Sequence, residues 1–149
     1  MGWTNSHLHQ FIKNDKNYTE RMGMDYLWDE EYNVDYLSME ISDLLEKEMD
    51  SMIYEYDFGD GWEHEVLLEE ILERDQNIIY PICVDGAMNC PPDDCGGILG
   101  FYDMLKILKQ PKHEEYKSYL MWLGGKYDPE KFDLKRVNKM LGMRNFGMR

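Results

Sequence analysis

The chain has 149 residues, of which 43% are hydrophobic and 13% aromatic, and this composition excludes a disordered protein. The net charge of −14, from 30 acidic against 16 basic residues, argues against direct binding of nucleic acid, because such proteins usually present a basic patch. No apolar run approaches the length of a membrane span, and no signal segment opens the chain, so we expect a cytoplasmic protein. The length predicts a single domain over residues 1–149.

The first part of the chain predicts a strand over residues 7–13, a turn over 14–17 and a returning strand from residue 18. Residues 20–36 show no period and predict a long loop, and residues 38–47 predict a short helix. In the first strand, alternation places His7 and His9 on one face. The pair suits a metal or an anion, although two histidines on a strand are more often half-buried structural residues.

The strongest hairpin signal lies in residues 52–72. A strand over Ser51–Tyr56 is followed by a connection with two glycines, which supply the positive φ that such turns need. The partner strand, Trp62–Leu72, places Trp62 and His64 on one face. Later in the chain, residues 78–81 predict a short strand, and residues 98–110, 114–123 and 134–141 predict three helices. Strands that precede helices predict an α+β fold, in which C-terminal helices pack on an antiparallel sheet.

The three cysteines lie close together in the sequence, at Cys83, Cys90 and Cys95. An odd number without a secretory signal disfavours a disulfide framework and favours free thiols or metal ligands. Zinc is the metal that such a set would hold, with His7, His9 or His64 as the fourth ligand. The alternative is that the cysteines pack as small apolar groups.

Acidic residues occur in the hairpin connection and in the segment around the cysteines. Asp57 and Asp60, with His64, are candidates for cation ligands or for an acid and a base, and the alternative is that the aspartates hydrogen-bond the turn. Asp93 or Asp94 is predicted to cap the helix that begins near Ile98.

These motifs resemble the plasmid pRiA4b Orf-3-like family. The matching stretches run through nearly the whole chain: residues 2–11, 54–64, 80–86, 90–101, 122, 128–132 and 137–138. The resemblance implies a compact α+β domain found in plasmid, mobile-element and chromosomal proteins, with no settled activity. It also implies that the family's N-terminal strand and helix are lacking here, because Met1 directly precedes the Gly2-Trp3 step. We therefore expect an exposed sheet edge that a second copy of the chain closes or that is poorly ordered.

Two classes of function follow from these observations, besides a plain interaction domain. The first is a binding module for a metal, a small ligand or a protein partner, in which the sheet face and the cysteine loop form a pocket. Its ligand-binding residues would be His7, His9, Tyr56, Trp62 and His64. The alternative is a metal-assisted hydrolase that uses Asp57, Asp60 and His64.

Overall fold

The computed structural model describes residues 2–21 and 29–143, and its contacts divide the chain into two compact units. One, the sheet unit, is His7–Glu73. The other, the helical unit, combines Met1–Ser6 with Arg74–Arg149. The single domain expected over 1–149 stays a prediction. No helix of the described ranges has the length and apolar character that a bilayer crossing requires.

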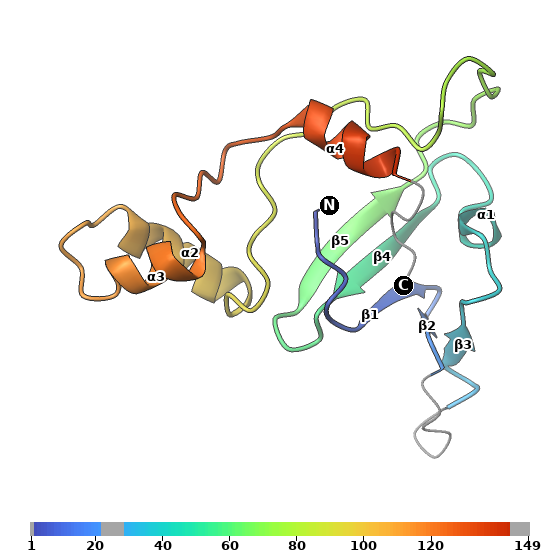
Figure 1. The fold of residues 1–149 in the computed structure, drawn as a ribbon. Helices are drawn as coiled ribbons and strands as arrows, with labels where there is room; N and C mark the ends of the chain where they lie inside the picture. Colours follow the sequence, from blue (N-terminus) through green and yellow to red (C-terminus); the bar gives the residue numbers. More distant parts are fainter. Residues whose placement is uncertain (1, 22–28, 144–149) are drawn as a thin grey trace. The chain divides into compact units, whose positions relative to one another are not determined.

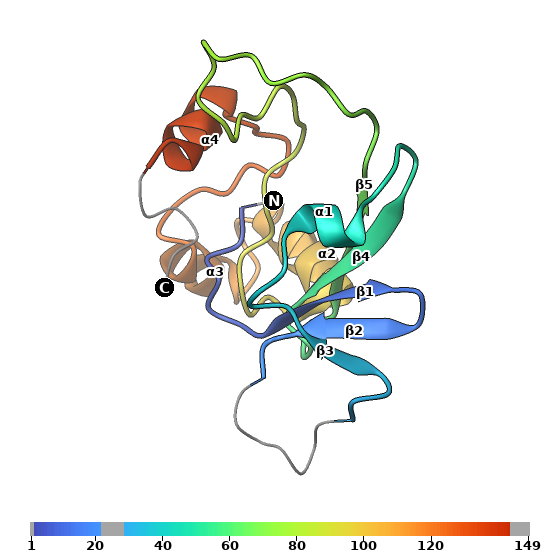
Figure 2. The same cartoon turned by 90° about the vertical axis from the view of Figure 1, so that its right-hand side faces the viewer.

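The sheet unit contains a five-stranded sheet of order β3-β2-β1-β4-β5 (Figures 1 and 2). Its strands are β1 (His9–Lys13), β2 (Lys16–Thr19), β3 (Asn33–Asp35), β4 (Ser51–Tyr56) and β5 (Trp62–Leu67). All neighbouring pairs are antiparallel except β2 and β3, which are parallel. The predicted hairpin is therefore confirmed, but its second strand ends at Leu67 and not at the predicted Leu72. The sheet, together with the four helices of the described residues, confirms the predicted α+β class.

The strand β3 lies inside the segment that the sequence predicts to be a loop. It has three residues and pairs with β2 from Asn17↔Asn33 to Thr19↔Asp35. A strand this short at a sheet edge shows too few residues for an alternating pattern to be visible. Part of the predicted loop, residues 22–28, lies outside the described residues.

The backbone of β4 is shared between its two neighbours in alternate residues. Asp57 N–H donates to Leu8 O, which continues the β1 ladder, and Leu68 N–H donates to Asp50 O, which continues the β5 ladder. In an antiparallel pair, alternate residues point their backbone groups at the partner strand. The odd-numbered residues of β4 therefore bond to β1, and the even-numbered ones bond to β5.

A small core lies under one end of the sheet, where Leu44, Leu45 and Met52 are buried. Leu44 ends α1 (Ile41–Leu44), a helix much shorter than the predicted 38–47. The chain leaves the helix because the Asp50 carboxylate accepts a hydrogen bond from Glu46 N–H at 3.1 Å and fixes a turn there. Lys13 forms an ion pair with the same carboxylate at 3.2 Å.

The helical unit contains α2 (Gly97–Leu108), α3 (Tyr116–Trp122) and α4 (Leu134–Leu141), in the order and near the positions that the sequence predicts (Figure 1). The predicted strand at 78–81 is not formed. The predicted cap of α2 is also wrong. Gly96, with φ of 85°, occupies the cap position and no side chain caps it, because the Asp93 carboxylate accepts hydrogen bonds from Thr4 and Ser6 instead.

Candidate functional site

One face of the sheet unit carries most of the predicted ligand-binding residues. Cross-strand pairing sets His9 opposite Tyr56, and Tyr54 opposite His64. The His7 ring lies 5.8 Å from that of Tyr56, and the His64 ring lies 5.6 Å from that of Tyr54. Alternation along neighbouring strands therefore gathers a histidine–aromatic face, defined as His7, His9, Tyr54, Tyr56, Trp62 and His64.

Contacts within the unit orient each imidazole of this face. His9 Nε2 lies 2.9 Å from the Tyr36 hydroxyl, and His64 Nδ1 lies 3.0 Å from the Tyr54 carbonyl oxygen. Tyr56 is completely buried, which gives it a packing role. Burial, followed by the neighbouring Tyr56 and Tyr36, raises the pKa of Tyr54 to about 12, so its hydroxyl stays protonated at neutral pH.

The carboxylate of Asp57 holds the turn between β4 and β5. Asp57 is buried and has a φ of 56°, a left-handed conformation that aspartate tolerates better than most residues. Its Oδ1 accepts hydrogen bonds from Gly59 N–H at 3.0 Å and Asp60 N–H at 3.3 Å, and its Oδ2 lies 3.5 Å from His7 Nδ1. Asp57 therefore hydrogen-bonds the turn, which is the role that the sequence predicts as the alternative to cation binding or acid–base catalysis.

The predicted hydrolase residues do not form one compact set. In the described ranges, the side-chain ligand atoms of Asp57, Asp60 and His64 do not all come within 4.8 Å of one another. A shared cation or a direct proton relay needs closer approach than this. The use of these three residues by a metal-assisted hydrolase therefore stays a prediction.

None of the three cysteines of the helical unit forms a disulfide, and each is half-buried. The side chain of Asn138 binds both backbone groups of Cys83. Cys83 N–H donates to Asn138 Oδ1 at 2.7 Å, and Asn138 Nδ2 donates to the Cys83 carbonyl oxygen at 2.8 Å. Cys90 accepts a hydrogen bond from the Tyr127 hydroxyl at its carbonyl oxygen, at 3.0 Å. Over the part of the chain that the structure describes, the three thiols do not gather within 4.8 Å of one another.

Burial, followed by the charges of Asp93 and Cys95, raises the pKa of the Cys90 thiol to about 11. A thiolate is the form that attacks electrophiles and binds metals. Cys90 is therefore a neutral thiol at physiological pH.

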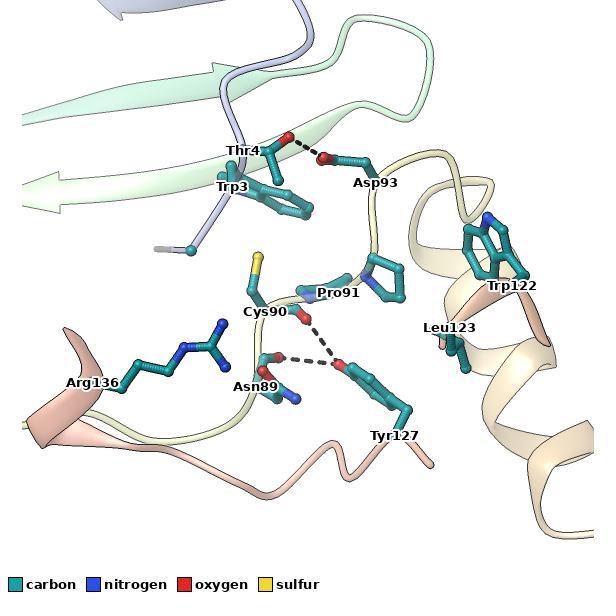
Figure 3. Close-up of a pocket in the computed structure, with 12 residues that line it drawn as sticks. Trp3, Thr4, Asn89, Cys90, Pro91, Asp93, Trp122, Leu123, Tyr127 and Arg136 are labelled. Carbon is teal, nitrogen blue, oxygen red and sulfur yellow. Dashed lines mark hydrogen bonds between the residues drawn. The ribbon is translucent and has the colours of Figure 1, made fainter. Parts of the chain in front are cut away.

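A pocket of about 510 Å³ adjoins Cys90 in the helical unit (Figure 3). Three stretches that are far apart in the sequence supply its wall: Gly2, Trp3 and Thr4; Asn89, Cys90, Pro91, Pro92 and Asp93; and Trp122, Leu123, Tyr127 and Arg136. We call this the cysteine-loop pocket. It combines two indole rings, two prolines, one carboxylate and one guanidinium.

Specific contacts bring these stretches together. Gly2 has a φ of +110°, and a Cβ at this position would lie 2.7 Å from Cys90 Cβ, so only glycine fits there. The hydroxyls of Thr4 and Ser6 both donate to Asp93 Oδ2, which ties the N-terminal segment to the cysteine loop. Both contacts lie within the stretches that carry the family resemblance.

Arg136 supplies the positive charge of the pocket. It lies in the first turn of α4, where its backbone N–H donates to Asp133 Oδ1 at 2.9 Å, and its side chain extends toward the pocket (Figure 3). In the described ranges its guanidinium has no ion pair. The sequence directs attention to Cys90 and the motifs around it but does not place Arg136 at a site, because one arginine among the neighbouring bases of a helix is most simply a solvated surface residue.

Taken together, the fold and the pocket define a small α+β protein with a five-stranded, mostly antiparallel sheet and an aromatic-walled cavity beside a cysteine loop. The chain belongs to the plasmid pRiA4b ORF-3-like protein family, whose sequence profile matches residues 1–136.

Two relatives are similar to the chain. The uncharacterized protein y4hQ of Sinorhizobium fredii (strain NBRC 101917 / NGR234) is 33% identical over 144 residues, which cover 93% of this chain and 70% of the relative. The crystal structure of MM3350, a protein of unknown function from Methanosarcina mazei Go1, is 35% identical, with a TM-score of 0.73. That match covers 90% of this chain and 74% of MM3350.

Proposed function

We propose that this protein is a small-molecule-binding module and that the cysteine-loop pocket is its binding site. The observation that carries the proposal is the convergence of three distant stretches on one cavity that contains an arginine without an ion pair among the described residues. Small-molecule sites are typically concave and supplied with a few fixed polar groups, which set the orientation of the ligand.

The chemistry of the wall indicates the class of ligand. The indoles of Trp3 and Trp122 and the rings of Pro91 and Pro92 offer flat apolar surfaces, which suit a planar ring. The guanidinium of Arg136 suits a carboxylate, sulfonate or phosphate group, which it can bind through two parallel hydrogen bonds. We therefore propose a planar organic molecule with one anionic group.

A pair of fluorescent probes tests this proposal. The anionic probe is 8-anilinonaphthalene-1-sulfonate, and N-phenyl-1-naphthylamine is its neutral counterpart without the sulfonate. The Arg136→Gln variant should weaken binding of the sulfonate about tenfold, because a hydrogen bond to a charged group contributes about 1.5 kcal/mol. Binding of the neutral probe should stay unchanged.

The control variant is Lys139→Gln, which removes the same charge from α4 at a position outside the pocket wall. It should bind both probes as the parent does. The proposal is wrong if both variants weaken sulfonate binding equally, or if the parent does not bind the sulfonate. Circular dichroism spectra of the variants would verify that they remain folded.

The predicted zinc site of Cys83, Cys90 and Cys95 stays a prediction. Elemental analysis of protein purified without a metal-affinity tag would test it. Stoichiometric zinc that is lost in the Cys95→Ser variant would support the site. Metal-free protein whose stability is unaffected by that substitution would favour the role of the thiols as packing groups.

A further inference from the structure

We infer that the outer edge of β5 accepts an extended, basic segment of a partner protein as a sixth strand. Within the described ranges β5 pairs with β4 alone, so it forms one border of the sheet. An edge strand presents a row of backbone donors and acceptors, and adding a peptide strand to such a row is a common mode of recognition.

The pairing of β5 with β4 identifies the backbone groups on the open side. The bond from Leu68 N–H to Asp50 O and the register of the hairpin show that even-numbered residues of β5 bond to β4. The N–H and carbonyl groups of Glu63, Glu65 and Leu67 therefore point away from β4. All three residues are exposed. No backbone bond joins them to another described segment on that side.

The side chains around this edge select a basic partner. Glu63 and Glu65 lie on the same sheet face as Glu55, because residues two apart share a face and Glu55 pairs directly with Glu63. Like charges directly opposite each other on adjacent strands destabilise a sheet. Gln10 Nε2 donates a hydrogen bond to Glu55 at 2.6 Å, but a neutral amide does not offset the negative charge. A lysine or arginine from a sixth strand, placed opposite Glu63 or Glu65, would offset part of it.

The opposite face of β5 determines which residue types suit the partner positions that alternate with the basic ones. Trp62, His64 and Val66 are half-buried there, so the matching residues of a sixth strand should be apolar. The expected partner segment therefore alternates basic and apolar residues. A second copy of the chain fits poorly, because antiparallel pairing of two β5 edges would place Glu63 opposite Glu65, or Glu65 opposite itself.

Fluorescence anisotropy with a labelled peptide tests this inference. The probe is the peptide Lys-Val-Lys-Thr-Lys-Val, which matches the length of β5. A second peptide has the same sequence, with backbone methyl groups on the residues that would donate to the edge. The parent protein should bind the first peptide, and methylation should weaken binding at least tenfold, because a methylated amide cannot join the ladder.

Two charge variants complete the design. Glu63→Lys/Glu65→Lys should weaken binding of the unmethylated peptide at least tenfold. The control, Glu69→Lys/Glu70→Lys, has the same change of charge just beyond the strand and should stay within about twofold of the parent, apart from a weak long-range effect that salt screens. Thermal melts of both variants would verify folding.

Three results would overturn the inference. Equal loss in both charge variants would indicate diffuse attraction between an acidic protein and a basic peptide. Equal binding of the two peptides would exclude strand addition. A dimer in sedimentation velocity that the Glu63→Lys/Glu65→Lys variant dissociates would show that a second copy occupies the edge.

Discussion

Replacing Asn138 with alanine would remove the side chain that holds the cysteine loop to α4. Asn138 Nδ2 donates to the Cys83 carbonyl oxygen at 2.8 Å, and Asn138 Oδ1 accepts from Cys83 N–H at 2.7 Å. The amide thus pairs with both backbone groups of one residue, as a neighbouring strand would. Alanine leaves both backbone groups of Cys83 without this partner, and the loop loses this attachment to the helix.

The expected cost follows from these two bonds. Each neutral hydrogen bond contributes about 1 kcal/mol, and both residues are half-buried, so water replaces the lost partner only in part. We therefore expect the free energy of unfolding to fall by about 2 kcal/mol. For a chain of about 150 residues, this corresponds to a decrease in melting temperature of roughly 4–8 °C.

Guanidinium unfolding followed by circular dichroism would measure the change. Asn138→Asp is a matched variant that keeps an acceptor for Cys83 N–H but cannot donate to the Cys83 carbonyl. It should also destabilise the protein. Lys139→Ala, an exposed neighbour on α4, should stay within about 0.5 kcal/mol of the parent. If Asn138→Ala also stays within that margin, the two bonds do not hold the loop and the reasoning is refuted.

Three further results are expected. Burial raises the pKa of Tyr54 to about 12, so the stability that the protonated hydroxyl contributes is complete below the unfolded pKa of roughly 10 and is lost as the pH rises toward 12. In urea unfolding at alkaline pH, Tyr54→Phe should lose less unfolding free energy per pH unit than the parent does. An equal loss in the two proteins would contradict this expectation. In a Cys83→Ser/Cys95→Ser background, alkylation of Cys90 by iodoacetamide should keep accelerating up to about pH 11. A rate that is half-maximal near pH 8.5, the pKa of roughly 8.5 that a free thiol has, would show an ordinary thiol. Asp57→Ala should cost about 2 kcal/mol by chemical denaturation, and Asp57→Asn should cost clearly less because asparagine tolerates the left-handed backbone and still accepts a turn bond; equal costs would count against the turn role.

The sequence predicts the elements whose signal is local. The strand Ser51–Tyr56 is confirmed with its predicted bounds, because its residues alternate and a glycine-containing turn ends it. The helix Leu134–Leu141 is also confirmed with its bounds. The sequence overestimates α1, because its end is set by the Asp50 carboxylate beyond the helix and by the ion pair of Asp50 with Lys13.

The candidate site depends on contacts that have no local signal. Nothing in the residues around Asp93 shows that its carboxylate binds Thr4 and Ser6, almost ninety positions earlier in the chain. The role of Asn138 is likewise decided by Cys83, which is 55 positions away. Composition and motif spacing could therefore direct attention to the cysteine loop, but they could not show which residues close the pocket around it.

The alternate hydrogen bonding of the β4 backbone to β1 and β5 restricts where residues can be inserted into this chain. Because odd residues bond to β1 and even residues bond to β5, one residue inserted within β4 would exchange the two neighbours beyond the insertion. The same shift would turn Tyr54 or Tyr56 to the face that carries Glu55. Relatives that differ in length around this hairpin should therefore carry their insertions after Asp57, in the turn over residues 58–61, where neither ladder is interrupted.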